Sequence, residues 1–280
     1  MTAAGRYIPS MLTRQSSLAT ERNDGANTPI ECIDGDPAIG FLILCDHATT
    51  IMPAEYGDLG LPRRELERHI AYDIGARTVA LELAAGLGAP AILTRFSRLL
   101  IDPNRDSDDP TLVMRIADRA VVPGNANIDA TEIDARRRRF HEPYHRAIDV
   151  GIERGIAAGV PPALFSVHSF TPNFHGQARP WHATVLWDAD PRLPLPLLRA
   201  LDDEGDLVIG ENVPYSGKLQ GDTLYSHATR RGLAHALIEI RQDLIVDPEE
   251  GRKWGQRLAR LLSGICGTPG LNEIVAPPPA

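Results

Sequence analysis

Two histidines stand at the ends of apolar segments, where a sheet could bring them together around a metal ion. His47 follows the apolar run 41–45, and His168 follows the largely apolar run 163–167. Ligands of open α/β sheets gather beyond the carboxyl ends of the strands, and a neutral imidazole is a common zinc ligand. Taken alone, His47 could equally cap a turn or lie hydrogen-bonded in the core. The same pattern recurs at two further segment ends, which deliver Arg105 and Glu239, and this favours a functional site.

Glu239 is the candidate catalytic base. It lies inside an apolar segment, between Ile238 and Ile240, where a carboxylate needs a partner or takes a raised pKa. Such a group suits a general base that takes the proton of a metal-activated water. The alternative is structural, because Arg241 shares the strand face of Glu239 at a period of two and the two could form an ion pair.

Two further segments carry groups that could bind a substrate. Asn104 and Arg105 follow an Asp-Pro pair, and a guanidinium can bind a carboxylate through two parallel hydrogen bonds. Arg105 could instead form a salt bridge with an acidic neighbour, namely Asp102, Asp106 or Asp108. A later glycine-bearing loop offers hydroxyl and ammonium groups for a polar substrate, on Tyr215, Ser216 and Lys218.

Composition excludes several classes of protein. The 280 residues carry a formal net charge of −8, so no basic surface for nucleic acid is indicated. The three cysteines show no metal-binding spacing, which fits a reducing compartment. No apolar run is long enough for a signal peptide or a membrane span. We therefore expect a cytoplasmic protein with no membrane or nucleic-acid partner.

Strand and helix patterns alternate along the chain, which predicts a single α/β domain. We expect a mixed, mostly parallel sheet with helices on both faces over 29–270, a flexible arm at 1–28 and a frayed tail at 271–280. Strands are expected at 39–45, 91–96, 99–101, 163–168, 184–186, 207–209 and 237–241, and helices at 63–86, 130–158, 194–204, 223–231 and 251–265. His141 and His145 have metal-chelating i, i+4 spacing, but their charged neighbours favour a solvated helix face.

Several segments, in order between residues 40 and 260, resemble the N-formylglutamate amidohydrolase family. They are Asp46-His47-Ala48, His69 to Ala76, Ser97 to Arg105, Ser166 to Phe170, Pro214 to Gly217, Gly221 to Thr223 and Ile238 to Leu244. The resemblance implies a zinc-exopeptidase-like α/β fold and hydrolysis of an N-formyl amino acid to formate and the free amine. The chain is also distantly similar to zinc carboxypeptidases, whose pattern implies His47 and His168 as ligands, Arg105 as the carboxylate clamp and Glu239 as the base.

The third metal ligand departs from the carboxypeptidase pattern. Thr50 stands where those enzymes have a glutamate, and a neutral hydroxyl is a poor zinc donor. Asp73, on the helix expected after the loop, is the candidate ligand. It could equally orient His47 without touching the ion.

The expected activity is that of a metal-dependent amidohydrolase acting on a small carboxylate substrate, most closely N-formyl-L-glutamate. Zinc bound by His47, His168 and a carboxylate would activate water, and Glu239 would take its proton. Arg105, with Arg241 or Lys218, would hold a substrate carboxylate. Two alternatives stay open: a hydrolase of a different N-acyl amino acid or small peptide, and a non-catalytic metal- or carboxylate-binding module. The resemblance also suggests histidine degradation as the pathway, and a homo-oligomeric assembly stays open.

Overall fold

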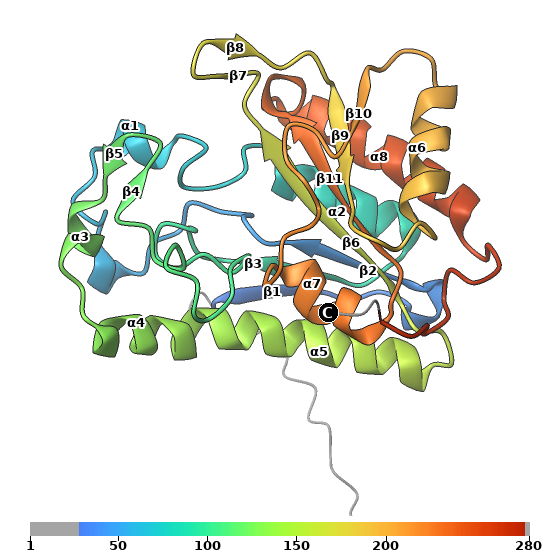
Figure 1. Ribbon diagram of the computed structural model, residues 1–280, viewed down its shortest axis with the longest axis horizontal. Helices are drawn as coiled ribbons and strands as arrows, with labels where there is room; N and C mark the ends of the chain where they lie inside the picture. Colours follow the sequence, from blue (N-terminus) through green and yellow to red (C-terminus); the bar gives the residue numbers. More distant parts are fainter. Residues whose placement is uncertain (1–27, 278–280) are drawn as a thin grey trace, which may run out of the picture.

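A seven-stranded sheet forms the centre of the computed structural model, which describes residues 28–277 (Figure 1). The strands lie in the order β1 (Ile30–Ile33), β3 (Ala91–Thr94), β2 (Phe41–Cys45), β6 (Ala163–Phe170), β11 (His235–Arg241), β9 (Ala183–Leu186) and β10 (Ile209–Glu211). β1 is antiparallel to β3, and β9 is antiparallel to β11, whereas the other neighbouring pairs are parallel. The predicted single α/β domain with a mixed, mostly parallel sheet is confirmed.

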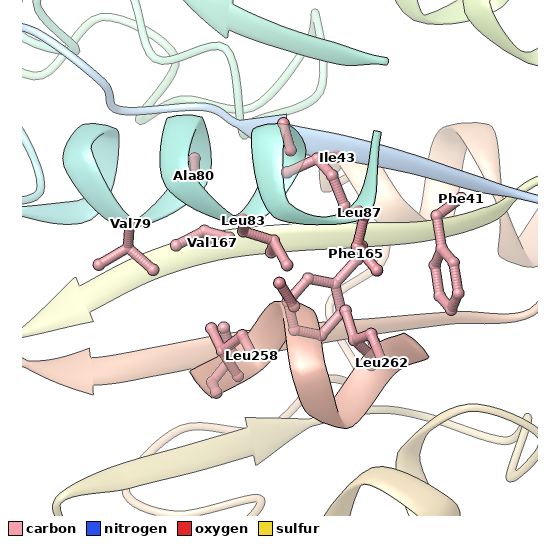
Figure 2. Packing of buried hydrophobic residues seen from close by; sticks show 14 of the residues in the cluster. Phe41, Ile43, Val79, Ala80, Leu83, Leu87, Phe165, Val167, Leu258 and Leu262 are labelled. Atoms are coloured by element: carbon pink, nitrogen blue, oxygen red, sulfur yellow. The ribbon is translucent and has the colours of Figure 1, made fainter. Parts of the chain in front are cut away.

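Helices cover both faces of this sheet. One face packs against α2 (Ala76–Leu87), α6 (Pro194–Asp203) and α8 (Pro248–Ile265), and the other against α5 (Glu142–Ala157) and α7 (Thr223–His227). Because both faces are covered, every residue of β2 is buried, which explains its uninterrupted apolar sequence. Figure 2 shows side chains of β2 and β6 packed between α2 and α8.

Side-chain alternation along the strands decides which face carries the polar groups. Phe165 and Val167 point to the α2 and α8 layer, whereas Leu164 belongs to the core cluster on the α5 and α7 side. Since alternate residues share a face, His168 lies on the same side as Leu164. Glu239 lies beside His168 in the parallel register of β6 and β11. The sheet therefore delivers both side chains to its α5 and α7 face.

The predicted helix at 63–86 is wrong as a continuous element. It is divided into α1 (Arg63–Leu66) and α2, with an irregular segment between them. In that segment the Asp73 amide donates a hydrogen bond to the His47 carbonyl oxygen at 2.9 Å. Gly75 caps the N-terminus of α2 with a φ of 82°, and a Cβ there would lie 2.3 Å from the Ile245 carbonyl oxygen. These tertiary contacts outweigh the local helical pattern and place Asp73 beside the end of β2.

The predicted strand at 99–101 is also wrong. Leu99, Leu100 and Ile101 are fully buried but form no strand. Residues 98–100 form a turn, in which the Leu100 amide donates to the Ser97 carbonyl oxygen at 2.9 Å. An apolar run of three residues satisfies a buried turn as well as a strand, so periodicity could not separate the two. The turn still leads to Asp102 and the Asn104-Arg105 pair.

The predicted helix at 130–158 is interrupted by a wider turn. α4 (Ala130–Arg136) passes into a π-helical turn (Arg137–His141) and then into α5. Such turns rotate the following residues relative to a regular helix. His141 is buried and His145 is partly buried, so the predicted solvated face is wrong for both.

Small elements that the sequence did not indicate form the rim of the molecule. They are the β-hairpins β4 (Ile116–Ala117) with β5 (Ala120–Val121) and β7 (Asn173–Phe174) with β8 (Gln177–Ala178), and the short helix α3 (Pro123–Ala126). The edge strand β1 was also not indicated.

A flexible arm at 1–28 and a frayed tail at 271–280 were predicted for the two ends of the chain. The arm at 1–28 lies, except for Thr28, outside the described residues. At the other end, Leu271 is buried and the Asn272 amide donates to the carbonyl oxygens of Gly40 and Pro161, so the start of the expected tail is docked. No helix among residues 28–277 is both long enough and apolar enough to cross a membrane.

Candidate active site

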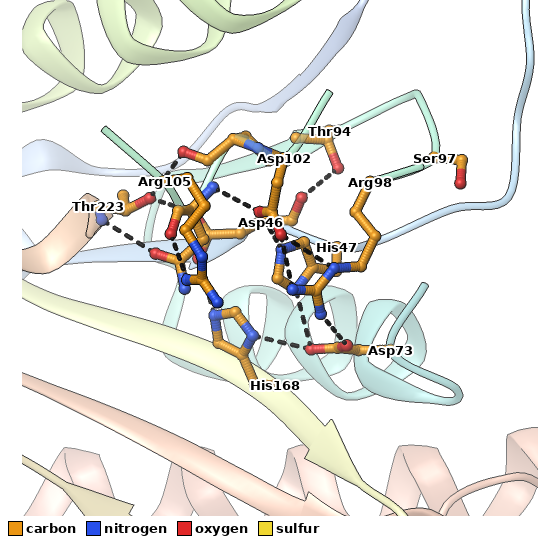
Figure 3. Close-up of polar contacts among 12 residues, drawn as sticks. Asp46, His47, Asp73, Thr94, Ser97, Arg98, Asp102, Arg105, His168 and Thr223 are labelled. Carbon is orange, nitrogen blue, oxygen red and sulfur yellow. Dashed lines mark hydrogen bonds and ion pairs between the residues drawn. The ribbon is translucent and has the colours of Figure 1, made fainter. Parts of the chain in front are cut away.

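Two imidazoles and one carboxylate converge at the carboxyl ends of β2 and β6. His47, Asp73 and His168 are buried, and each offers a ligand atom within 4.8 Å of those of the other two (Figure 3). Asp73 Oδ2 lies 3.3 Å from His47 Nδ1 and 2.8 Å from His168 Nδ1. This is a donor set that zinc and similar divalent ions accept. The three residues predicted as ligands therefore lie together.

The outer nitrogen of each imidazole bonds to a further buried carboxylate. His47 Nε2 lies 2.8 Å from Asp102 Oδ1, and His168 Nε2 lies 2.8 Å from Asp46 Oδ2. A carboxylate on the outer nitrogen fixes the ring and its tautomer in many metal sites. With Nε2–H donating outward, both Nδ1 atoms are left facing Asp73 and the space between the three residues.

Electrostatics tie this group together. Burial alone would lower the pKa of His168, but its hydrogen bonds to Asp46 and Asp73 outweigh burial and raise that pKa well above its ordinary value. Burial would raise the pKa of Asp73, but the neighbouring His47 and His168 lower it well below its ordinary range. Paired in this way, the carboxylate stays charged in a buried site and can serve as a ligand.

Asp46 and Asp102 are themselves held from several sides. Asp46 accepts hydrogen bonds from hydroxyl groups of three elements, at 3.0, 2.8 and 2.6 Å; the donors are Tyr144, Ser166 and Thr223. Arg98 donates two bonds to Asp102 Oδ2, at 2.6 and 3.1 Å, and its Nη1 lies 3.8 Å from Asp73 Oδ1. Because these carboxylates are fully bonded, their orientation of the imidazoles is rigid.

Glu239 carries an unsatisfied oxygen beside the three residues. Its Oε2 is buried and has no hydrogen-bond partner among residues 28–277. Burial, with the nearby charge of Asp73, raises the pKa of Glu239 to about 7. Arg241, the alternative partner, bonds instead to Asp243 at 2.8 Å and to carbonyl oxygens of residues 179–181. A buried carboxylate with a free oxygen and a pKa near neutrality is suited to proton transfer.

The Asn104-Arg105 pair lies on the α7 side of the site. Asn104 Oδ1 accepts a hydrogen bond from the Thr223 amide at 2.9 Å, so this side chain joins two loops. Arg105 donates to the Asn104 carbonyl oxygen at 2.8 Å and forms no ion pair with a described carboxylate. The alternative salt bridge to a neighbouring aspartate is therefore not formed, and the guanidinium keeps donors for another anion.

The predicted loop residues lie further from the centre. The Tyr215 hydroxyl accepts a bond from Arg179 at 2.8 Å, and the Ser216 hydroxyl accepts one from the Lys218 amide at 3.2 Å. Ser216 and Lys218 are exposed. Burial raises the pKa of Tyr215, and the charges of Glu239 and Asp73 raise it further, which places its hydroxyl within electrostatic reach of the site.

Sequence reasoning missed the supporting carboxylates and Arg98. Asp46 and Asp102 stand beside residues that were singled out, and the polar side chains ending two apolar runs were the available signal. Arg98 lies in the resembling segment Ser97 to Arg105, but its contact with Asp73, 25 residues earlier, could not be predicted from the local pattern.

A second histidine cluster packs against the loop that carries Asn104 and Arg105. His145 Nδ1 is 2.7 Å from His227 Nε2, and His145 Nε2 is 3.1 Å from His141 Nε2. Two of these rings also hold the loop: His145 lies 3.0 Å from the Pro103 carbonyl oxygen and His141 lies 2.9 Å from that of Arg105. We call His141, His145 and His227 the histidine row.

Comparisons with known proteins identify the family of this chain. The sequence profile of the N-formylglutamate amidohydrolase family matches residues 39–246. This range contains Glu239 and the three candidate metal ligands His47, Asp73 and His168, which we call the triad. The chain belongs to the N-formylglutamate amidohydrolase family. As a member, it is an amidohydrolase, an enzyme that acts on a non-peptide carbon–nitrogen bond.

Solved structures show the same fold as this family member. The structure of gene product Atu2144 from Agrobacterium tumefaciens has a TM-score of 0.77 and 32% identity, and the match covers 85% of this chain and 96% of that one. N-formylglutamate amidohydrolase from Ralstonia eutropha JMP134 has a TM-score of 0.65 and 19% identity, covering 85% and 97%. No curated protein matches the chain.

Proposed function

We propose that this amidohydrolase hydrolyses N-formyl-L-glutamate to formate and L-glutamate, with zinc held by His47, Asp73 and His168. The observation that supports it is the convergence of these three ligands beside a carboxylate whose Oε2 is buried without a partner. Thr50, which stands at the position of the glutamate ligand in the carboxypeptidase pattern, is exposed. In this proposal Asp73 supplies the carboxylate ligand in its place. The donor set therefore fits a divalent ion, and Nδ1 of each ring would be its ligand.

A divalent ion in this position would supply Lewis acidity and lower the pKa of a nearby water. Glu239 then acts as the base: it takes a proton from the attacking water and passes it to the leaving nitrogen. A pKa of about 7 suits both steps, because the group can accept and release a proton near neutrality. The formyl C–N bond breaks, and the products are formate and the free amine.

Arg105 binds a substrate carboxylate in this proposal. Its guanidinium has no carboxylate partner among the described residues, and Asn104 fixes the loop through Thr223. Tyr215, Ser216 and Lys218 offer further polar groups to the substrate. Arg241 bonds to Asp243 and to the backbone of residues 179–181, so in this proposal it supports the site from behind Arg179.

The proposal extends to the setting of the enzyme. Cys45 and Cys266 form no disulfide with any residue in the range 28–277, which supports a reducing, cytoplasmic compartment. The family resemblance supports a place in histidine degradation.

Formate release from N-formyl-L-glutamate tests the proposal. We expect activity in the purified enzyme, its loss on treatment with a chelator, and its return when one equivalent of zinc is added. Full activity in a metal-free preparation would contradict the metal-dependent mechanism. Activity on N-acetyl amino acids or small peptides, with none on the formyl substrate, would instead assign the enzyme to the deacylase alternative.

A further inference from the structure

Arg179 is a buried cation without a carboxylate partner in the part of the chain that the structure describes. It is 7% exposed and forms no ion pair with any residue in the described range 28–277. Its Nη2 donates to the Tyr215 hydroxyl at 2.8 Å, and its Nη1 makes only long contacts, of 3.4 and 3.5 Å, with Thr171. By contrast Arg136, the other arginine buried to this degree among these residues, pairs with Glu132 at 2.7 Å. A buried charge is normally paired, because removing it from water is costly.

Three aromatic rings surround this guanidinium. Its central carbon lies 5.7 Å from the ring centre of Phe170, 4.8 Å from that of Phe174 and 5.1 Å from that of Tyr215. Cation–π contacts offset part of the desolvation but leave the in-plane N–H donors unused. The rings of Phe174 and Tyr215 are partly exposed, at 36% and 43%. The arrangement is thus a cage that can still present hydrogen-bond donors to a ligand.

The cage adjoins the proposed catalytic centre. Phe170 and His168 share one face of β6, and their register partners on β11 are Arg241 and Glu239. Phe170 therefore lies two residues after His168, roughly 7 Å further along the strand. Arg241 in turn holds the Arg179 carbonyl oxygen at 3.2 Å. The cage therefore lies beside the strand positions that carry His168 and Glu239.

We propose that Arg179 determines substrate specificity by binding the second carboxylate of the substrate, so that the site selects N-acyl derivatives of dicarboxylic amino acids. This inference rests on the proposed function. Arg105 binds one carboxylate from the α7 side, and Arg179 binds the other from the loop that leads into β9. A planar guanidinium matches a carboxylate bidentately, whereas a neutral amide of the same shape accepts fewer of its bonds and leaves the charge unpaired.

Substrate pairs that differ in one charge test this role. We compare kcat/KM for N-formyl-L-glutamate with that for N-formyl-L-glutamine, in the wild-type enzyme and in Arg179→Met. The wild type should prefer the glutamate derivative by about 10- to 100-fold, the range expected for a hydrogen-bonded charge pair. In Arg179→Met this ratio should fall at least tenfold, mainly through a higher KM for the glutamate derivative. Arg179→Lys should keep part of the preference, because the charge remains.

The controls separate this role from a structural one. Arg230→Met removes an exposed arginine of the turn Thr229–Arg231 and should keep the wild-type ratio. An equal loss for both substrates in Arg179→Met, or a wild type without preference, would overturn the inference and leave the proposed function standing. A wild type inactive on both would overturn the proposed function and this inference with it. If Arg179→Met does not fold, inhibition of the wild type decides: glutarate should inhibit at least tenfold more strongly than its monoamide, and equal inhibition would overturn the inference.

Discussion

The two histidine groups of this enzyme have the same side chain but opposite surroundings. In the triad, each imidazole bonds to two carboxylates, and the pKa of His168 is raised. In the histidine row, burial and the neighbouring imidazoles lower the pKa of His145 to about 3, and burial lowers that of His141. The carboxylates of the triad therefore stabilise a positive charge between the rings, whereas the surroundings of the histidine row keep His141 and His145 neutral.

This difference shows why spacing alone does not identify a metal site. His141 and His145 have the i, i+4 spacing of helical metal ligands, yet both use ring nitrogens to hold the carbonyl oxygens of Arg105 and Pro103. Within residues 28–277, no carboxylate lies among the rings of the histidine row as Asp73 lies between His47 and His168. Asp149 contacts only the outer ring, at 3.0 Å from His227. Shared carboxylates, which only the fold reveals, separate the two groups.

Removing one imidazole from each group should give the largest contrast. His168→Ala should lose bound metal and reduce kcat/KM at least about 1000-fold, because both metal chemistry and the base depend on this site. His145→Ala should keep one equivalent of metal and lose far less activity. Metal analysis by mass spectrometry with formate-release kinetics measures both. Loss of metal in His145→Ala with retention in His168→Ala would reverse the assignment.

Replacing the base should separate chemistry from metal binding. We expect Glu239→Gln to keep the metal of the triad and to lower kcat by about 100- to 10,000-fold, the contribution of a positioned base. Because Oε2 has no partner among the described residues, the fold should tolerate the amide. Unchanged turnover, measured with metal content in the same sample, would remove Glu239 from the mechanism.

The carboxylates behind the triad should have an intermediate effect. Asp102→Asn keeps the shape of the side chain but weakens its bond to His47 Nε2. Losses of about 10- to 100-fold in metal affinity are expected when such an orienting carboxylate is changed. Zinc titration against a competing chelator measures this change, and an unaltered affinity would show that Arg98 and the fold alone orient the ring.

The histidine row should appear in the pH dependence of stability. The pKa of His145 is about 3 in the folded enzyme and near 6.5 when unfolded, so the unfolded chain binds the extra proton between these values. Stability contributed by neutral His145 is complete above pH 6.5 and falls as the pH falls toward 3. The groups facing it are His141, His227 and, more distantly, Asp46.

A variant of this histidine isolates that effect. Between pH 7.5 and 5 we expect the wild type to lose about 1 to 2 kcal/mol more unfolding free energy than His145→Gln. Urea unfolding at the two pH values measures the difference. Equal losses in both proteins would mean that His145 titrates normally.

Local patterns were enough to predict most strands of the sheet, its two helix layers and the places of His47, His168 and Glu239 at or beside strands. These residues lie on or directly after strands, and strand alternation determines where their side chains point. The broken helix before Asp73 and the turn at residues 99–101 were missed, because each depends on contacts between distant segments such as the bond from the Asp73 amide to His47. The cage around Arg179 draws on three separate segments, so no local pattern could indicate it.

An anomalous difference map at the zinc absorption edge tests the central claim most directly. The account predicts one strong peak between Nδ1 of His47, Nδ1 of His168 and the Asp73 carboxylate, at roughly 2.0–2.2 Å from each ligand atom. No peak at this position in a fully active, zinc-loaded crystal, or a peak among the rings of the histidine row, would contradict it.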